Sequence, residues 1–420
     1  MSTSPAHSSI SSSAGSVSGF PEEDLREGGR DNPGYFAARL GQRLERGRYC
    51  IVRKLGWGQY SSVWLARDRG QDSFVALKIL TCEATKALSA GPDQRSDEQR
   101  MLEKIANADH AHRGYRHNLA YLNAFDIRGT HGLHRCLVTE ALGYGVDYIR
   151  KLRDDNDRRV APSIVKRVVR QVLLGLEYLH DVCGIVHTDL KNDNILFRPR
   201  DLCTIVAHEL AENPSVTYDC GTEGNASVVP VVSQVLPLSV DASIHERDLD
   251  VVLADVGHSH WIEHHFQELI QPDALRAPEV ILGHPWSTPA DIWSVGCLVT
   301  EWLVGFWLFE PNRERLWSYE EDHLARMTEA LDAQFEASTL ENCKHRDKYF
   351  KQDGTFAHFT DHEEPTWPLR KLLESFSELG DEVDAAEAFL KRCLQLAPER
   401  RATAKELVDD PWLAAPAVSK

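Results

Sequence analysis

The chain has 420 residues, of which 42% are hydrophobic and 26% charged, a composition that is ordinary for a folded protein. Its formal net charge of −17 argues against a nucleic-acid backbone as a direct partner and is compatible with basic proteins or peptides. No apolar run of about eighteen residues and no secretory signal occur, so we expect no membrane span. The nine cysteines form no CxxC pair and therefore indicate neither a zinc site nor a disulfide framework. The cytoplasm, the nucleus or both are the expected location.

The N-terminal part of the chain changes character near Arg48. Residues 1–34 are rich in Ser, Gly and Pro, and we expect this tail to be disordered. Three short segments rich in Val, Ile, Leu and aromatic residues follow, separated by turns that contain Gly. They predict consecutive antiparallel strands at residues 49–55, 62–67 and 74–80.

A helix and two more strands complete the first part of the chain. Residues 96–106 have apolar side chains at helical spacing, and residues 120–127 and 135–140 have the composition of strands. After Gly143 long helical patterns dominate, at residues 163–180, 291–303 and 385–396.

The order of these elements predicts the fold class. We expect an α+β protein with two lobes: a small antiparallel sheet with one main helix at about 48–140, and a larger, mostly helical lobe at about 141–413. Residues 199–247 lack periodicity, apart from a possible helix at 203–212, and we interpret them as an inserted loop.

The first segment with a chemical signature is LGWGQYSSV at residues 55–63. Gly56 and Gly58 would let the backbone present N–H groups to phosphate oxygens, although a plain β-turn has the same pattern. Lys78 ends the apolar strand VALK, and such an inward lysine needs an anionic partner, which ATP phosphates supply. Glu98 in the following helix can hold this lysine, with Glu103 as the alternative.

The segment HTDLKNDNIL at residues 187–196 has the most specific polar pattern. Asp189, Lys191 and Asn194 form a compact set just before a predicted strand. In phosphoryl transfer, the carboxylate orients the attacking hydroxyl and takes its proton, the lysine offsets charge on the γ-phosphoryl group, and the asparagine oxygen ligates Mg²⁺. A chance match at all these positions is improbable.

A third segment, LADVG at residues 253–257, ends an apolar strand in Asp255, whose hard oxygens suit Mg²⁺. In the order glycine loop, lysine, glutamate, Asp…Asn loop and Asp255, these residues predict phosphoryl transfer. Two acids farther along the chain have expected structural roles. Glu279 is expected to pair with Arg401, and Asp291 to cap the backbone of the catalytic loop.

Together these segments resemble the eukaryotic protein-kinase signature set, over roughly residues 48–413. Within that superfamily the sequence resembles the SR-protein kinases, which phosphorylate serines in arginine-serine repeats of splicing factors. The resemblance implies a serine/threonine-protein kinase that uses ATP and Mg²⁺, acts on basic or arginine/serine-rich proteins, and is a monomer. It rests on LGWGQYSSVWL (55–65), HTDLKNDNIL (187–196), STPADIWS (287–294), LFEP (308–311), EDHLA (321–325), and RAT (401–403) before DPWL (410–413).

The resemblance also implies roles for individual positions. Lys78 and Glu98 would form an ion pair, Asp189 would be the base with Lys191 beside it, and Asn194 and Asp255 would ligate magnesium. Thr139 would be the gatekeeper behind adenine. The implied nucleotide contacts are Leu55, Gly56, Trp57, Gly58, Ser61, Val63, Ala76, Lys78, Thr139, Glu140, Leu142 and Leu196, with Glu140 and Leu142 offering backbone groups to adenine.

Substrate docking is a further implication. In the family, acidic residues of the helical lobe hold the arginine-rich part of the substrate, and a guanidinium fork matches such carboxylates. Asp322 and Glu329 fall on two of these positions, two helical turns apart and therefore on one face. A third docking position is occupied here by Phe306.

Two other departures concern the active site. The segment QPDALR at residues 271–276 lacks the threonine that in the family bonds the catalytic Asp and Lys, so Pro272 and Asp273 alter the substrate side. Thr188 stands where many kinases have an arginine that receives an activation-loop phosphate, so we expect activity without such phosphorylation.

Two alternatives to an active protein kinase remain open at this point. A pseudokinase or scaffold would bind partners through the helical lobe and catalyse little; Pro272 and Asp273 favour it, whereas the complete catalytic set opposes it. A small-molecule kinase of the same fold is disfavoured, because the APE segment at 277–279 and the acidic region around Asp322 suit extended peptide substrates.

Overall fold

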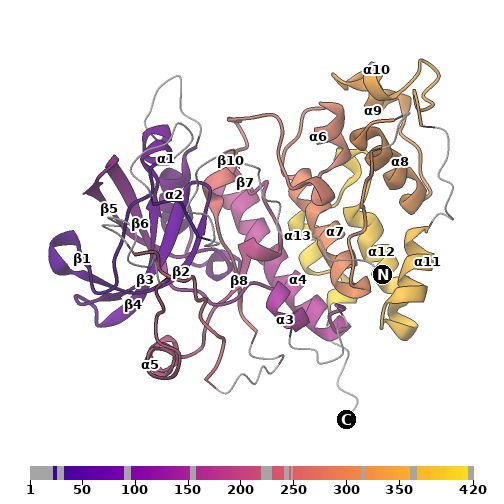
Figure 1. Cartoon of the computed structure of the whole chain (residues 1–420). Helices are drawn as coiled ribbons and strands as arrows, with labels where there is room; N and C mark the ends of the chain where they lie inside the picture. The colour runs from indigo at the N-terminus through magenta and orange to yellow at the C-terminus, as the bar shows by residue number, and fades with distance from the viewer. Residues whose placement is uncertain are drawn as a thin grey trace, which may run out of the picture.

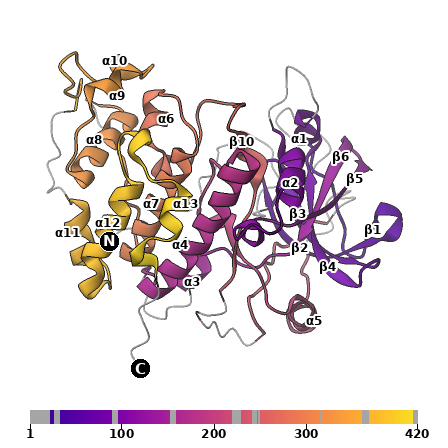
Figure 2. The same ribbon diagram turned by 180° about the vertical axis from the view of Figure 1, so that it is seen from behind.

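The computed structural model describes residues 22–25, 33–88, 96–151, 158–218, 229–240, 246, 249–313, 317–359 and 367–414. These residues form a sheet-rich lobe and a larger helical lobe, which lie side by side in two opposite views (Figures 1 and 2). The predicted α+β architecture is therefore confirmed.

The first lobe contains one antiparallel sheet with the strand order β1-β2-β3-β4-β6-β5. Val75, Leu77 and Ile79, two positions apart on β4, are buried in a common cluster with Ile51 and Val138, which is the alternation expected for a strand with one face in a core. The strands are β1 Arg43–Leu44, β2 Tyr49–Gly58, β3 Ser61–Asp68, β4 Ser73–Leu80, β5 Tyr121–Gly129 and β6 Gly132–Glu140.

Two helices belong to this lobe. Helix α1 (Cys82–Ala87) starts at Thr81, whose hydroxyl caps it by accepting from the N–H of Ala84. Helix α2 (Glu98–Asn107) buries Met101, Leu102 and Ile105, and these side chains join the core of the helical lobe. Because α2 is packed in this way, Glu98 at its first turn is held beside the sheet.

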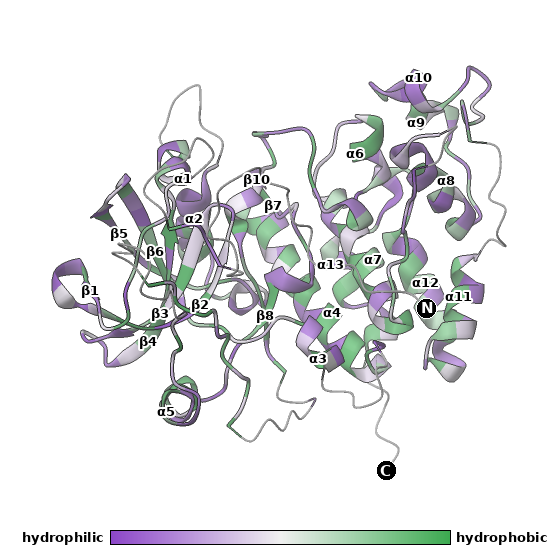
Figure 3. Cartoon of the chain, in the orientation of Figure 1, coloured by the Kyte–Doolittle hydropathy of each residue, from purple (hydrophilic) through white to green (hydrophobic). Residues whose placement is uncertain are grey.

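Helices α4 (Pro162–Glu177) and α7 (Pro289–Val304) form the centre of the second lobe; α7 is predominantly hydrophobic, whereas α4 also carries hydrophilic residues (Figure 3). A π-helical turn, Tyr178–Cys183, extends α4. In the described ranges no helix has the length and apolar character that a membrane span requires. The remaining helices are α3 Asp147–Lys151, α5 Leu202–Glu212, α6 Pro278–Leu282, α8 Tyr319–Leu331, α9 Ala337–Glu341, α10 Arg346–Tyr349, α11 Leu369–Phe376, α12 Val383–Cys393 and α13 Ala404–Val408.

Two short antiparallel pairs frame the residues with expected catalytic roles. Strand β7 (Ile185–Val186) pairs with β10 (His260–Trp261), and β8 (Ile195–Phe197) pairs with β9 (Val251–Leu253). The loop between β7 and β8 carries Asp189, and Asp255 follows β9. These pairs therefore hold together two segments that are far apart in the sequence.

Packed structure begins before the change of sequence character near Arg48, and it includes part of the tail that was expected to be disordered. Phe36 lies in the core of the sheet lobe, and the hydroxyl of Tyr35 donates a hydrogen bond to the carbonyl of Gly58 at 2.8 Å. Farther upstream, Glu22 and Glu23 pair with the buried ammonium group of Lys54. A buried lysine needs carboxylate partners, and this requirement explains why part of the Ser-rich tail is packed. Residues 1–21 and 26–32 of the tail lie outside the described residues.

The inserted segment packs against the sheet. Its predicted helix is confirmed as α5, and Glu209 on this helix pairs with the buried Arg53 of β2 at 3.0 Å. Ser233 forms an isolated β-bridge with Lys54. Residues 219–228, 241–245, 247 and 248 of the segment lie outside the described residues.

Candidate active site

The glycine-containing loop forms the hairpin between β2 and β3. A side chain placed at either Gly56 or Gly58 would meet no other atom within 4 Å, so the space beside the loop is open. Trp57 is 43% exposed, and its ring contacts that of Tyr35 edge-on, with centroids 6.3 Å apart. The loop thus has open space beside its two glycines, and Tyr35 of the N-terminal segment contacts the turn of the hairpin at Gly58 and Gln59.

Lys78 joins the two lobes through two carboxylates. Its Nζ atom lies 2.5 Å from Glu98 on α2 and 2.7 Å from Asp255 after β9, so the predicted pair with Glu98 is confirmed. Burial alone would lower the pKa of Lys78, but the two carboxylates outweigh burial and raise it. For Asp255 burial would raise the pKa, but Lys78 lowers it below its usual range and keeps the carboxylate ionised. The three side chains form a charged bridge between sheet, helix and helical lobe.

The loop after β7 brings Asp189, Lys191 and Asn194 together. The Nζ atom of Lys191 donates to Oδ2 of Asp189 at 2.8 Å, and the amide of Asn194 donates to the same oxygen at 2.9 Å. The side chain of Asp189 is 13% exposed. A carboxylate held by two donors, with one oxygen still open, has the arrangement expected of a group that orients a substrate hydroxyl.

Asp291 on α7 holds the backbone of this loop. Its carboxylate oxygens accept hydrogen bonds from the N–H groups of His187 and Thr188, both at 2.8 Å, as the sequence predicted. The ring of His180 lies 2.8 Å away on the same carboxylate. Burial would raise the pKa of Asp291, but these contacts outweigh it and lower the pKa. The ionised carboxylate of Asp291 therefore fixes the backbone of the catalytic loop at His187 and Thr188.

Sequence reasoning missed the residues that hold the segment after Asp255. The indole N–H of Trp261 donates to Asp97 at 2.8 Å, and the hydroxyl of Ser96 donates to the carbonyl of Gly257 at 3.1 Å. Both contacts tie the start of α2 to this segment. The one available signal was the position of Asp97 directly before Glu98, where an acidic N-cap is common.

The expected nucleotide contacts are divided between the two lobes. Leu55 and Ala76 pack in one apolar cluster, and Leu142 packs with Val252, Ala254 and the half-buried Leu196 in another. The side chain of Glu140 turns away to pair with Arg198 at 2.7 Å. No contact of the described residues tests these expected roles, which stay predictions.

The altered segment at 271–276 is anchored without the missing threonine. The side chain of Gln271 donates to the carbonyl of Ala290 at 2.7 Å and accepts from the N–H of Ala277 at 3.0 Å. Gln271 adopts a φ of +68°, which is unusual for a residue other than glycine. The contact between Asp189 and Lys191 is present even though the segment 271–276 lacks the threonine that would bond both side chains.

The predicted pair of Glu279 and Arg401 is confirmed. Both side chains are fully buried, with N–O distances of 2.5 and 2.6 Å, and the guanidinium lies 5.0 Å from the ring centroid of Trp293. This bidentate pair ties α6 to the segment before α13.

The structure corrects the expectation that Asp322 is an open docking group. The side chain of Asp322 is only 1% exposed, and it accepts hydrogen bonds from Arg326 at 2.7 Å and from the N–H of Asn312 at 2.9 Å. Helical spacing predicted that Asp322 and Glu329 share one face of the helix. It did not predict that Arg326, one turn after Asp322, would pair with Asp322. Glu329 is half-buried on the same helix, and Phe306 is 44% exposed against Phe376.

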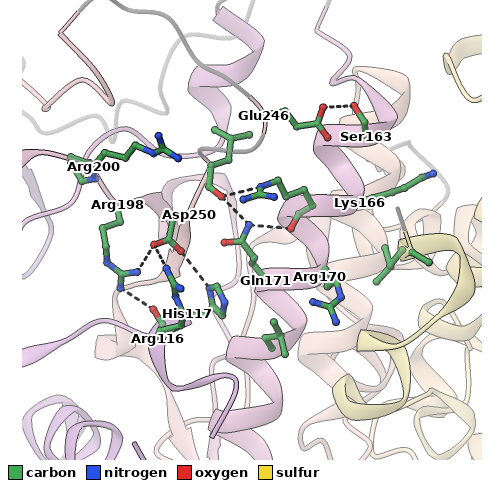
Figure 4. Close-up of a pocket in the computed structure, with 16 residues that line it drawn as sticks. Arg116, His117, Ser163, Lys166, Arg170, Gln171, Arg198, Arg200, Glu246 and Asp250 are labelled. Carbon is green, nitrogen blue, oxygen red and sulfur yellow. Dashed lines mark hydrogen bonds and ion pairs between the residues drawn. The ribbon is translucent and has the colours of Figure 1, made fainter. Parts of the chain in front are cut away.

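A cavity of about 930 Å³ beside α4 is lined by none of the expected catalytic, metal or nucleotide residues (Figure 4). Six of its lining residues are cationic, but carboxylates compensate most of them: Asp250 lies between Arg116 and Arg198, Lys166 pairs with Glu382, and Arg170 lies 3.7 Å from Asp409. Its basic character is therefore largely balanced by ion pairs within the protein.

Comparisons with known proteins agree with this geometry. The family model described as protein kinase domain matches residues 49–224 and 243–413. The serine/threonine-protein kinase SRPK of Physarum polycephalum is 32% identical, over 93% of this chain and 90% of its own length. Protein kinase dsk1 of Schizosaccharomyces pombe is 29% identical (90% and 83%), and SRSF protein kinase 3 of Mus musculus is 26% identical (90% and 88%). A crystal structure of a kinase domain, 23% identical, has the same fold, with a TM-score of 0.64 over 90% of this chain and 99% of that one.

Proposed function

Since this chain belongs to the protein kinase family and is a serine/threonine-protein kinase, we propose that it transfers the γ-phosphate of ATP to serines of arginine/serine-rich proteins. One observation carries the catalytic part of the proposal. Lys78 contacts both Glu98 and Asp255. Phosphoryl transfer in this fold requires the lysine–glutamate ion pair together with an aspartate that holds the metal ion, and these contacts bring the three side chains together. A scaffold that catalyses little is not favoured, because it would not need this assembled set.

The residues of the chain divide the chemistry among them. Asp189 accepts a hydrogen bond from the substrate hydroxyl, orients its oxygen and takes its proton as the bond to phosphorus forms. Lys191, 2.8 Å from Asp189, offsets negative charge on the transferred group. Lys78 pairs with the phosphates of ATP, and the N–H groups of the glycine loop cover them.

The oxygen donors around Asp255 fit a magnesium ion. The carboxylate of Asp255 is ionised, and the amide of Asn194 is near enough to Asp189 to share a hydrogen bond with it. Hard oxygen ligands of this kind are those that Mg²⁺ prefers. Asn194 and Asp255 would hold the ion, which when bound neutralises charge on the phosphates.

The substrate class is supported by the relatives and by the helical lobe. The name of one relative, SRSF protein kinase 3, states its class of substrate. In this chain Glu329 and the acidic surroundings of α8 favour basic segments, and Asp322 pairs with the guanidinium of Arg326 in the same helix. The same chemistry would recognise arginine side chains of a substrate.

The decisive experiment measures transfer of labelled phosphate from ATP to an arginine-serine peptide. Asp189→Asn should lower kcat by about 10²–10⁴, because the base is lost, whereas binding of Mg-ATP should persist in a thermal-shift assay. Asp193→Asn changes an exposed acid of the same loop and is the matched control. A lysine-serine peptide should be a poorer substrate, since lysine cannot form bidentate contacts.

Two results would contradict the proposal. If the unmodified protein transfers no more phosphate than Asp189→Asn to basic, neutral and acidic peptides, the enzyme function is wrong. Equal use of the arginine and lysine peptides would reject the proposed substrate class and leave the kinase activity in place.

A further inference from the structure

His258 adds a nitrogen ligand to the carboxylates of the active site. Its Nδ1 atom is 4.0 Å from Oδ2 of Asp189, and one ligand atom each from Asp189, Asp255 and His258 lies within 4.8 Å of the others. Within the part of the chain that the structure describes, this is the one group of three or more His, Cys, Asp or Glu side chains that approach so closely.

The local backbone aligns two of these side chains. Asp255 has a φ of +58° and caps the 3₁₀ turn Val256–His258. This short turn separates Asp255 from His258 by three positions, and one ligand atom of each lies within 4.8 Å of the other. The hydroxyl of Thr188 donates to the carbonyl of His258 at 2.7 Å. The backbone of His258 is thus fixed to the catalytic loop, while its side chain is 47% exposed and able to turn.

The combination of two carboxylates and one imidazole suits a transition metal better than it suits Mg²⁺. Mg²⁺ favours oxygen ligands, whereas imidazole suits Zn²⁺ and related transition metals. Two carboxylates and one imidazole correspond to an open zinc site with three protein ligands. A tetrahedral ion would need its ligand atoms ~3.3 Å apart. Rotation of the exposed ring would bring the nitrogen of His258 closer to the carboxylates, and rotation of the carboxylates would bring their oxygens closer to each other. Lys191 and Asn194 occupy Oδ2 of Asp189, and Lys78 occupies Oδ1 of Asp255, so the ion would be bound through the other oxygen of each carboxylate.

We propose that Asp189, Asp255 and His258 form a binding site for Zn²⁺, and that its occupancy inhibits the kinase. Zn²⁺ at this place would engage the carboxylate that takes the proton of the substrate hydroxyl, and would lie where Asp255 is needed for the nucleotide. The inhibitory part rests on the proposed function, whereas the binding part stands without it.

Binding is tested by titrating Zn²⁺ into the full chain in competition with a chromogenic chelator, and Co²⁺ into it as a spectroscopic probe. Cys203→Ser serves as the background, because the thiol of Cys203 is exposed and is itself a soft ligand. His258→Asn should weaken binding at one site at least about tenfold and remove the visible Co²⁺ band of a four-coordinate site. His264→Asn changes an exposed histidine of the same segment and should leave both unchanged.

Inhibition is tested at a fixed concentration of Mg-ATP. Zn²⁺ should inhibit the background protein and His264→Asn equally, and His258→Asn should need at least about tenfold more Zn²⁺ for half inhibition. If the background protein and His258→Asn have the same Zn²⁺ affinity and the same Co²⁺ spectrum, the proposed metal site is wrong. Weaker binding without protection from inhibition would overturn the inhibitory role. A protein that transfers no phosphate would reject the proposed function, yet the titrations would still decide the metal site.

Discussion

The indole N–H of Trp261 on β10 donates to the carboxylate of Asp97, 2.8 Å away, at the start of α2. Glu98, the next residue, is the partner of Lys78. The contact therefore couples the position of the segment after Asp255 to the position of the helix that completes the catalytic set. It needs no phosphate group, which agrees with Thr188 in place of a phosphate-binding arginine.

Replacement of this tryptophan should loosen α2. Trp261→Phe keeps most of the ring but removes a hydrogen bond to a charged group, which contributes about 1.5–3 kcal/mol. We expect kcat to fall about tenfold and amide hydrogen exchange in α2 to accelerate. Trp307→Phe, at a tryptophan that is 50% exposed, should change neither measurement. Unchanged exchange in α2 would show that Trp261 does not position the helix.

Removal of Arg326 should expose a docking carboxylate. Arg326→Ala frees the buried Asp322 from its guanidinium partner, so that an arginine of the substrate can replace it. We expect KM for an arginine-rich peptide to fall about fivefold with little change in kcat, because the gain is in binding. KM for a neutral peptide should not change. An unchanged or higher KM for the arginine-rich peptide would mean that Asp322 does not contact substrate.

Loss of the buried pair of Glu279 and Arg401 should destabilise the helical lobe. Glu279→Gln leaves the guanidinium of Arg401 buried without a full counter-charge, which costs about 3–5 kcal/mol in the free energy of unfolding. Urea denaturation measures this change. Asp384→Asn removes a surface partner of Arg370 and should have a much smaller effect. Similar midpoints for the two variants would contradict the structural role of the buried pair.

Stability should fall in mild acid because of His260. This side chain is 1% exposed, and its Nδ1 accepts a hydrogen bond from the N–H of Phe266 at 2.9 Å. Burial, followed by the nearby His265 and His258, lowers the pKa of His260 to about 4, whereas Asp291 raises it slightly. Between pH ~6.5 and 4 the unfolded chain therefore binds a proton that the folded chain does not, so stability is lost as the pH falls through this window.

His260→Asn keeps an acceptor for Phe266 but cannot titrate. Its free energy of unfolding should depend less on pH between 6.5 and 4 than that of the unmodified protein. His264→Asn, at an exposed neighbour, should retain the original dependence. Parallel pH profiles for all three proteins would assign the acid sensitivity to other groups.

Much of the site could be predicted because its motifs are local in the sequence. The loop with Asp189 and Asn194, the strand that ends in Lys78 and the strand that ends before Asp255 each combine a regular apolar pattern with polar residues at set intervals. Pairing rules then suggested Glu98 for Lys78 and Arg401 for Glu279, and both pairs are present. A buried charge has few possible partners, which is why these predictions were correct.

Predictions failed where the outcome depended on partners that no local pattern reveals. Composition assigned Glu22 and Glu23 to a disordered tail, but Lys54, buried in the sheet, requires their carboxylates. Helical periodicity placed Asp322 on the correct face, but it does not report the backbone N–H of Asn312 or the side-chain direction of Arg326.

The sequence by itself determined the two lobes, the family, and the set of polar residues that the catalytic loop brings together, because spacing along strands and loops sets which side chains lie together locally. Only the tertiary structure decided which of the many carboxylates are already neutralised and which remain open. Asp322 is bonded to Arg326, Asp97 holds Trp261, and Asp255 shares its surroundings with His258. Burial and charge pairing are properties of neighbours in space, so they arise only when distant segments pack.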